Sequence, residues 1–256
     1  MDRPFIETPA WIRMPRLVAT VRGDRSLEFL QAVLTQDVGS MQPDASAIAC
    51  YLDEKGHVLA EVRVAIAPGG GVTLHTTEAA REGLEQMARI APLSACEIEI
   101  ASTTVCCVRG PFGSDGAAPD GWGGFELPGR APVGVLEGSA SEWTAARIEA
   151  GQPVFGVDVT RETLINETPL AERAVSFTKG CYPGQETVAK ITNLGKVRKR
   201  LVRLRAADDE LPPVDGIKVT SQARTAGQTV ALGYARAELT GSVVVGGVEV
   251  SIEDLA

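Results

Sequence analysis

The sequence predicts an α+β protein that has mostly antiparallel sheets and an all-β C-terminal region. Between residues 47 and 101, strand-like runs surround one amphipathic helix, which is the pattern of a small α+β unit. The last ~60 residues hold only short strand-like runs and turns, which indicate a small barrel or sandwich. The chain has 256 residues, of which 44% are hydrophobic, so it can bury a core without disulfides or metal ions.

Hydrophobic spacing predicts the elements of the N-terminal half in order. A helix is expected to run to about residue 34 with Asp24 or Ser26 as its cap, because residues 27, 30, 33 and 34 share one face. A second helix is expected from Thr76 or Thr77 to about residue 89. Alternating apolar residues predict strands over residues 47–52, 58–66, 72–76, 96–102 and 103–110.

The second half begins with a segment, residues 113–124, whose Gly, Asp and Pro content predicts a weakly ordered loop. A helix is expected to start at Ser141 and to close at Gly151. Strands are then expected over residues 197–205, 216–221 and 229–239, followed by a hairpin that turns at Gly246-Gly247.

Charge and hydropathy exclude several classes of protein. The net charge of −8 argues against a general nucleic-acid or membrane-surface binder. No apolar run approaches the ~20 residues of a membrane-spanning helix. The first residues, MDRPFIETPAW, lack the apolar stretch of a signal peptide, so a cytoplasmic protein is expected.

The five cysteines divide into two kinds. Four lie in apolar or alternating runs and are expected to be small core residues: Cys50, Cys96, Cys106 and Cys107. The odd count and the lack of C-x-x-C spacing argue against disulfides and a zinc ribbon. His57 and His75 are the only histidines and have no partner at metal-ligand spacing, so structural or surface roles are expected for both.

Cys181 is different, because it lies in the polar, turn-forming stretch KGCYPGQETVAK. Lys179 and backbone N–H groups would favour its thiolate, which can act as a nucleophile, a redox sensor or a metal–sulfur ligand. The alternative is a cysteine packed in a turn.

Glu149 lies near a helix end, where the helix dipole disfavours a carboxylate. It therefore needs a partner, either Arg147 or a ligand with paired N–H donors, such as a guanidinium or a 2-aminopyrimidine. The alternative is a solvated acid.

A basic run follows the thiol, with no acid between residues 187 and 205. It can attract a polyanionic ligand or partner, or it can be the basic solvent face of a strand. The run consists of Lys196, Arg198, Lys199, Arg200, Arg203 and Arg205.

The segment KGCYPGQE resembles the K-G-C-Y-x-G-Q-E signature of the YgfZ-like folate-binding proteins, which are relatives of the glycine-cleavage T-protein, an aminomethyltransferase. The resemblance extends over nearly the whole chain. It includes FLQAVLTQDV, DEKGHVLAEV, R-I-E-A-G-x-P-x-x-G-x-D and ETPLAE.

This resemblance implies a fold of three lobes, arranged as a cloverleaf around a central channel. Residues 1–46 and 102–195 would form a discontinuous folate-binding α+β lobe. Residues 47–101 would form a ferredoxin-like α+β lobe, and residues 196–256 a small C-terminal β-barrel.

The resemblance also implies tetrahydrofolate or a derivative as the cofactor. Glu149 would hold the pterin edge, and Arg147, Lys179 and Tyr182 would be further folate contacts. The glutamate tail would meet basic residues, for which we expect Lys190, Lys196 and Arg198. Cys181 would be the functional thiol and a transient iron–sulfur ligand, and no resident metal is expected.

Two positions depart from the related families. The T-protein has an Asp-Asp pair where this chain has Ala60-Glu61, which argues against aminomethyl transfer and leaves enzymatic activity open. Lys190 stands where the signature often has arginine, so the charge is kept and the two-pronged hydrogen bonding is lost.

The expected function is therefore a tetrahydrofolate-binding protein that supports iron–sulfur cluster assembly or repair, with assembly or client proteins as partners. Membranes and nucleic acids are not expected as partners. A folate-dependent aminomethyl or one-carbon transferase is the first alternative, and an interaction module that keeps only the fold is the second.

Overall fold

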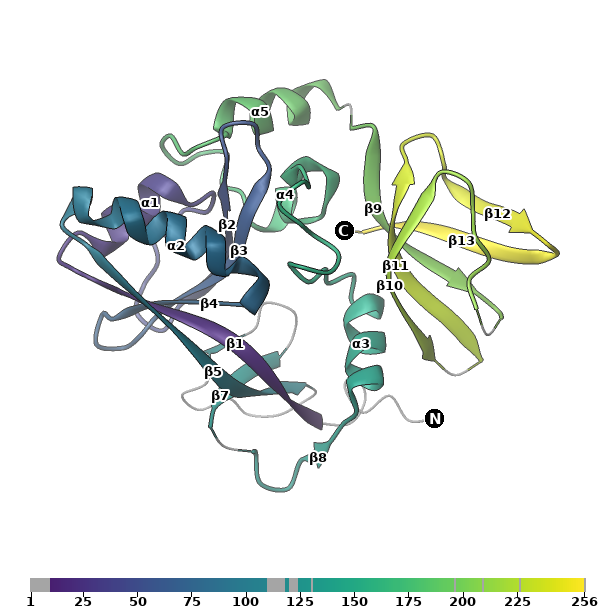
Figure 1. Cartoon of the computed structure of the whole chain (residues 1–256), viewed down its shortest axis with the longest axis horizontal. Helices are drawn as coiled ribbons and strands as arrows, with labels where there is room; N and C mark the ends of the chain where they lie inside the picture. The colour runs from purple at the N-terminus through teal and green to yellow at the C-terminus, as the bar shows by residue number, and fades with distance from the viewer. Residues whose placement is uncertain are drawn as a thin grey trace.

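The computed structural model describes residues 10–109, 118–119, 124–129, 131–195, 197–208, 210–225 and 227–255. Two sheets form its two bodies, which Figure 1 shows on the left and right with the segment from α3 to α5 between them. Among the predicted features, the first nine residues, most of the loop at 113–124 and Lys196 lie outside the described residues.

The larger sheet has eight strands in the order β2-β3-β4-β1-β5-β7-β6, with β8 added beside β1. All of its ladders are antiparallel except that between β1 and β8. The strands are β1 (Ala10–Arg22), β2 (Ser46–Leu52), β3 (Val58–Ile66), β4 (Val72–Thr76), β5 (Glu97–Arg109), β6 (Ala118–Pro119), β7 (Gly124–Pro128) and β8 (Leu136–Glu137). The runs predicted at 96–102 and 103–110 thus form one continuous strand.

Strand β1 is central to this sheet and was not predicted from the sequence. Pro15 interrupts its run of β-forming residues, and a proline normally excludes a central strand because it cannot donate a hydrogen bond. Here β4 pairs only with Leu17–Val21, so Pro15 lies in a stretch where β5 is the long partner and β4 is absent. The missing N–H group is tolerated for this reason.

Five α-helices and three short 3-10 helices occur in the described residues. The α-helices are α1 (Ser26–Val33), α2 (Arg81–Ile90), α3 (Ala140–Glu149), α4 (Leu170–Arg173) and α5 (Gln185–Leu194). The 3-10 helices are η1 (Glu78–Ala80), η2 (Ala91–Ser94) and η3 (Ile165–Glu167).

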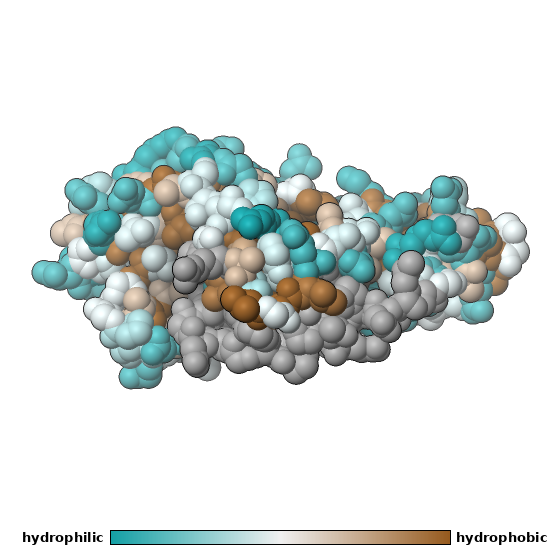
Figure 2. All heavy atoms as spheres, turned by 90° about the horizontal axis from the view of Figure 1, so that it is seen from below, coloured by the Kyte–Doolittle hydropathy of each residue, from teal (hydrophilic) through white to brown (hydrophobic). Residues whose placement is uncertain are grey.

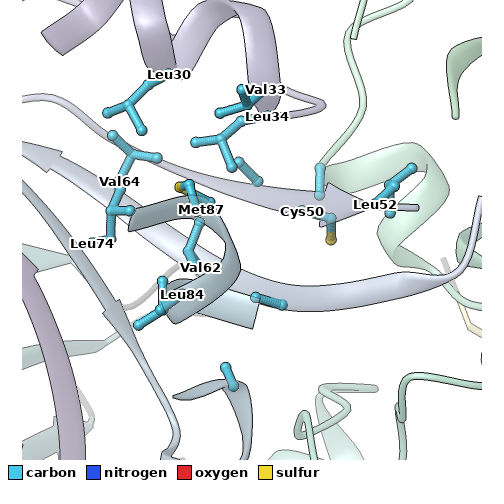
Figure 3. Packing of buried hydrophobic residues seen from close by; sticks show 14 of the residues in the cluster. Leu30, Val33, Leu34, Cys50, Leu52, Val62, Val64, Leu74, Leu84 and Met87 are labelled. Carbon is cyan, nitrogen blue, oxygen red and sulfur yellow. The ribbon is translucent and has the colours of Figure 1, made fainter. Parts of the chain in front are cut away.

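The main core lies between the larger sheet and the helices α1 and α2. Figure 3 shows Leu30 and Leu34 facing Val64 and Met87 across this core, and all four side chains are fully buried. Truncating a buried Leu or Met to Ala typically destabilises a protein by about 2–5 kcal/mol. This core therefore fixes the strands that carry the site described below.

The predicted side-chain caps are wrong for the first two predicted helices. Ser26 donates its hydroxyl to the carbonyl of Gly23, and no side chain caps α1. Thr77 donates to the carbonyl of Phe155, and η1 leads into α2 without a side-chain cap. Both hydroxyls thus donate to loop carbonyls, and neither accepts from a helix N–H group.

Helix α3 begins two residues earlier than predicted. Ser139, rather than Ser141, is its cap, because the Ser139 hydroxyl and the Glu142 carboxylate bond each other's backbone N–H groups in a capping box. The helix ends as predicted, with Gly151 in the left-handed region at φ +64°.

The smaller sheet has five strands in the order β10-β11-β9-β13-β12 and does not close into a barrel among the described residues. The predicted barrel is therefore wrong: closure needs a ladder between the end strands, and β10 instead packs against α3. The hairpin at Gly246-Gly247 is confirmed, with both glycines at positive φ. The strands are β9 (Lys199–Ala206), β10 (Ile217–Thr225), β11 (Gln228–Arg236), β12 (Gly241–Val245) and β13 (Val248–Asp254).

The surface fits a folded protein whose apolar residues are mostly inside. Seen from below, hydrophilic residues cover much of the left end, and hydrophobic residues form separate groups, one of them near the middle of this face (Figure 2). No helix in the described part of the chain is long and apolar enough to cross a membrane. The division into three domains stays a prediction.

Candidate functional site

The signature segment 179–186 is anchored on the C-terminal end of α1. Lys179 Nζ donates to the carbonyls of Gln31, Leu34 and Gln36 at 2.6, 2.5 and 3.0 Å. The last carbonyls of a helix have no partner within the helix, and an ammonium group has three donors to offer them. Burial lowers the pKa of Lys179 to about 8. The structure thus gives Lys179 a positioning role, and its contact with folate stays a prediction.

The next residues of the segment fold against the turn between β2 and β3. Tyr182 is buried in the main core, and Lys179 lies over its ring at 5.5 Å. Gly184 has φ +80°, and a Cβ on it would lie 2.4 Å from the Asp53 carbonyl oxygen. Only glycine fits this contact, which explains why the segment needs Gly184 before α5.

Cys181 is exposed, whereas Cys50, Cys96, Cys106 and Cys107 are all buried. This confirms that the cysteines are of two kinds and places one thiol at the surface, between the anchored Lys179 and the buried Tyr182. In the described part of the chain, no group of three or more His, Cys, Asp or Glu side chains is placed to hold a metal ion.

A cavity of about 120 Å³, which we call the Glu61 cavity, lies where the larger sheet meets α3 and residues 152–155. Trp143 and Phe155 supply apolar walls. Its charged and ionisable lining consists of Arg16, Glu61, Arg63, His75, Arg109, Glu126 and Arg147.

Glu126 is the acceptor at the centre of this charged lining. It accepts from Arg16 Nε at 2.8 Å and from Arg63 Nη2 at 2.5 Å, and His75 Nδ1 lies 3.6 Å away. Burial raises the pKa of the Glu126 carboxyl, but the contact with His75 and the charges of Arg63 and Arg16 outweigh it. They hold the pKa well below its ordinary value. Glu126 is therefore a permanent anion that orders its three neighbours.

Glu61 is the second carboxylate of the cavity, and it is differently placed. Its Oε2 atom is buried and accepts no hydrogen bond from the described residues. Burial raises the pKa of Glu61 to about 7, with the Arg16 charge lowering it and the Asp158 charge raising it by smaller amounts. Such a carboxyl exchanges its proton near neutral pH.

Two further polar atoms of the cavity lining are poorly satisfied: Arg63 Nε has no hydrogen-bond partner among the described residues, and His75 Nδ1 has only the 3.6 Å contact with Glu126. A buried polar atom left without a partner costs about 1–3 kcal/mol, so a group of them in one cavity indicates a polar ligand. His75 thus lines a cavity as well as binding Thr73 at 3.0 Å, a role that its sequence spacing did not predict.

Arg147 lines the same cavity and is buried. Its Nη1 donates to Asp158 Oδ2 at 2.7 Å and to the Gln152 carbonyl at 3.2 Å. The predicted folate residue Arg147 is therefore in the cavity wall, held by a buried carboxylate. Glu149, two residues later, does not line the cavity.

Glu149 has the two-pronged partner that its position near a helix end called for, and this partner is Arg205. The two guanidinium nitrogens Nη1 and Nη2 donate to Oε1 and Oε2 at 2.8 and 2.5 Å. Arg203 donates to the Glu149 backbone carbonyl at 2.5 Å. Both carboxylate oxygens thus bond within the protein, and binding of a pterin by Glu149 stays a prediction.

The basic run is largely neutralised by acids that are distant in the sequence. Strand β13 pairs antiparallel with β9, which sets its acids beside the arginines. Arg200 meets Asp254 at 2.5 Å, and Arg203 and Arg205 both meet Glu253, at 2.6 and 2.9 Å. The alternative of a basic strand face therefore accounts for the last three arginines of the run.

The predicted tail contacts are not brought to the cavity. Lys190 is exposed on α5, and Arg198 is exposed just before β9. Neither lines the Glu61 cavity. Their contact with a folate tail stays a prediction, as does that of Lys196.

Known proteins with a similar sequence carry one recurring name. The chain is 26% identical to the tRNA-modifying protein YgfZ of Escherichia coli O45:K1 (strain S88), with 76% of this chain and 71% of that protein covered. It is 27% identical to the protein of the same name from Klebsiella pneumoniae (strain 342), with the same coverage. No family model matches the chain.

The fold is similar to that of a solved structure. The glycine cleavage system aminomethyltransferase T from Bartonella henselae superposes with a TM-score of 0.78 over 98% of this chain and 86% of its own, at 17% identity. The chain thus resembles YgfZ in sequence and the T-protein in fold, as the motif around Cys181 predicts.

Proposed function

We propose that the chain binds a reduced folate, with its pterin ring at the Glu61 cavity. The observation that carries this proposal is that two buried atoms on the wall of one cavity, Glu61 Oε2 and Arg63 Nε, have no hydrogen-bond partner among the described residues. A pterin edge presents N–H donors beside nitrogen and carbonyl acceptors. A carboxylate and an arginine N–H complement such an edge.

The size of the cavity limits what it can hold. Its volume of about 120 Å³ is near that of the engineered cavity of about 150 Å³ that holds benzene. One aromatic ring fits, and a two-ring pterin requires the walls to widen. The aminobenzoyl-glutamate part must lie outside. Folate binding should therefore shift the residues 152–155 that form one wall.

Two carboxylates compete for the role of pterin acceptor. The resemblance assigns it to Glu149, which would have to exchange its two hydrogen bonds from Arg205 for those of the ligand. Glu61 requires no such exchange, because its Oε2 atom has no partner in the described residues. The structure thus adds Glu61 to the sequence-based prediction.

Calorimetry with tetrahydrofolate separates these assignments. Loss of the acceptor should weaken binding about tenfold to a hundredfold, which is the equivalent of about 1.5–3 kcal/mol. The variants to compare are Glu61→Ala and Glu149→Ala, with the exposed Glu97→Ala as a charge-matched control. Unchanged affinity in both test variants would reject folate binding at this site.

We further propose that this cytoplasmic folate protein supports iron–sulfur cluster assembly or repair through Cys181. The support is the resemblance together with the exposure of this thiol alone among the cysteines of the chain. Cys181→Ser keeps the size and removes the soft ligand. It should fold and bind folate normally but fail to restore iron–sulfur enzyme activity in cells that lack the protein. Full restoration at native expression would remove the thiol from the proposal.

One observation favours the alternative of one-carbon transfer. Glu61 replaces the acid pair of the T-protein only in part, yet it places a carboxyl of pKa about 7 at the cavity. This is the range in which a general acid or base works best at neutral pH. We expect no methylene-tetrahydrofolate from an aminomethylated lipoyl carrier. If the wild-type protein formed methylene-tetrahydrofolate and Glu61→Gln did not, the transferase function would be established instead.

A further inference from the structure

A second and larger cavity, which we call the Lys218 cavity, lies where residues 157–163 face strands β9, β10 and β11. Its volume is about 560 Å³, and it shares no lining residue with the Glu61 cavity. The Arg147–Asp158 ion pair stands between the two, since Arg147 lines the first and Asp158 the second.

Three cations line this cavity from three neighbouring strands. Lys199 lies directly opposite Arg236, and Lys218 directly opposite Tyr234, in antiparallel register. Directly opposed residues share a face of the sheet, and so do residues two apart on one strand, such as Tyr234 and Arg236. The three cations therefore lie on one face, and like charges directly opposite destabilise a sheet.

The acids near these cations offset them only in part. Glu167 lies 3.5 Å from Lys199, and the highly exposed Asp215 lies 3.5 Å from Arg236. Lys218 has no ion pair in the described part of the chain. Glu162 also lines the cavity, as one opposing acid.

Asp158 also lines the cavity, but the Arg147 cation balances its charge. Its Oδ2 accepts from Arg147 and from the Val154 N–H at 2.7 and 3.0 Å. Its Oδ1 accepts from the hydroxyls of Thr220 and Ser221, both at 2.6 Å. Among the cations of the lining, Lys218 is thus the one without an ion pair in the described part of the chain, and Glu162 is the acid that opposes it.

The cavity is shaped by a β-bulge. The register of β10 against β11 shifts between Val219 and Ser221, so Thr220 is the extra residue. A Cβ on Gly233 would lie 2.8 Å from the Lys218 carbonyl oxygen, so glycine lets β11 approach the bulge. Exposed Val157 and Val219 add an apolar side to the lining.

From this geometry we infer that the Lys218 cavity binds a small acidic molecule, with an anionic group at Lys218 and an apolar group beside Val157 and Val219. Carboxylates and phosphates share the required chemistry, because both accept from ammonium and guanidinium groups. The cations are partly exposed, so the affinity falls as the salt concentration rises.

The test uses the full chain and three probes with one aromatic ring each: phenyl phosphate, isophthalate and neutral benzamide. Backbone amide shifts are followed by NMR at low, constant ionic strength. We expect saturable shifts from one or both dianions in residues 157–163 and 216–220, and none from benzamide. The dianion that binds more tightly identifies phosphate or carboxylate as the preferred group.

Lys218→Gln should weaken dianion binding about tenfold, the effect of one charged hydrogen-bond donor. Lys55→Gln, which removes another exposed positive charge, should leave it unchanged. Dianion binding should persist in Glu61→Gln, which alters only the Glu61 cavity. A failure of dianion binding can therefore be distinguished from a failure of folate binding. Absent or non-saturable shifts, equal shifts with benzamide, or equal affinity in Lys218→Gln would overturn the inference.

Discussion

Replacing Glu61 by Gln should change how the stability of the protein depends on pH. Burial raises the pKa of Glu61 from its ordinary value of 4.5 to about 7 in the folded chain. A difference of that size is worth about 3 kcal/mol, at about 1.4 kcal/mol for each pH unit. The folded state binds the proton more tightly than the unfolded state. The contribution is therefore fully present below pH 4.5 and is lost as the pH rises through 7.

The assay is urea-induced unfolding of wild type and Glu61→Gln across this pH range. All other groups titrate in both proteins, so the difference in unfolding free energy isolates Glu61. Relative to wild type, the variant should gain about 3 kcal/mol between pH 4.5 and pH 8. Glu97→Gln, at an exposed position, should show little change. A flat difference for Glu61→Gln would refute the assignment of a neutral-range pKa to this carboxyl.

Two further predictions concern the signature segment. Gly184→Ala should destabilise the protein by clearly more than Gly195→Ala in thermal unfolding. Both glycines have positive φ, which costs an alanine about 1–2 kcal/mol, but only at Gly184 would the new Cβ meet a backbone oxygen. In the native state, iodoacetamide should modify Cys181 before any other cysteine, as read by peptide mass spectrometry, because the other four are buried. First labelling of Cys50 would contradict this.

The sequence predicts best what local spacing determines. The strands around 47–101, the end of α3 at Gly151 and the burial of four cysteines follow from alternation, turn residues and helix periodicity. The central strand β1 could not be predicted because it contains Pro15. Proline is excluded from a strand only where an adjacent strand would accept a hydrogen bond from its N–H group, and the sequence does not show which strands are adjacent.

The site was predicted less well, because long-range pairing decides it. Nothing near Arg205 in the sequence shows that it pairs with Glu149, or that Glu253 lies beside it through the β9–β13 ladder. From the resemblance, Ala60-Glu61 was interpreted as the loss of the T-protein acid pair. The structure instead places Glu61 on a cavity wall, where burial raises its pKa. A carboxyl on a strand shows its environment only when the opposing elements are known.

The buried pair of Arg147 and Asp158 has a consequence for how the two cavities act on each other. The pair separates the two cavities, because Arg147 lines the Glu61 cavity and Asp158 lines the Lys218 cavity. The hydroxyls of Thr220 and Ser221 on β10 hold Asp158 in place. Breaking a buried ion pair costs about 3–5 kcal/mol. The Arg147–Asp158 pair therefore stays intact unless a ligand takes the place of one of the two side chains. A molecule that moves this pair from one side changes the affinity on the other. Because such coupling is reciprocal, binding at the second cavity then changes the affinity of the first cavity for its ligand by the same factor.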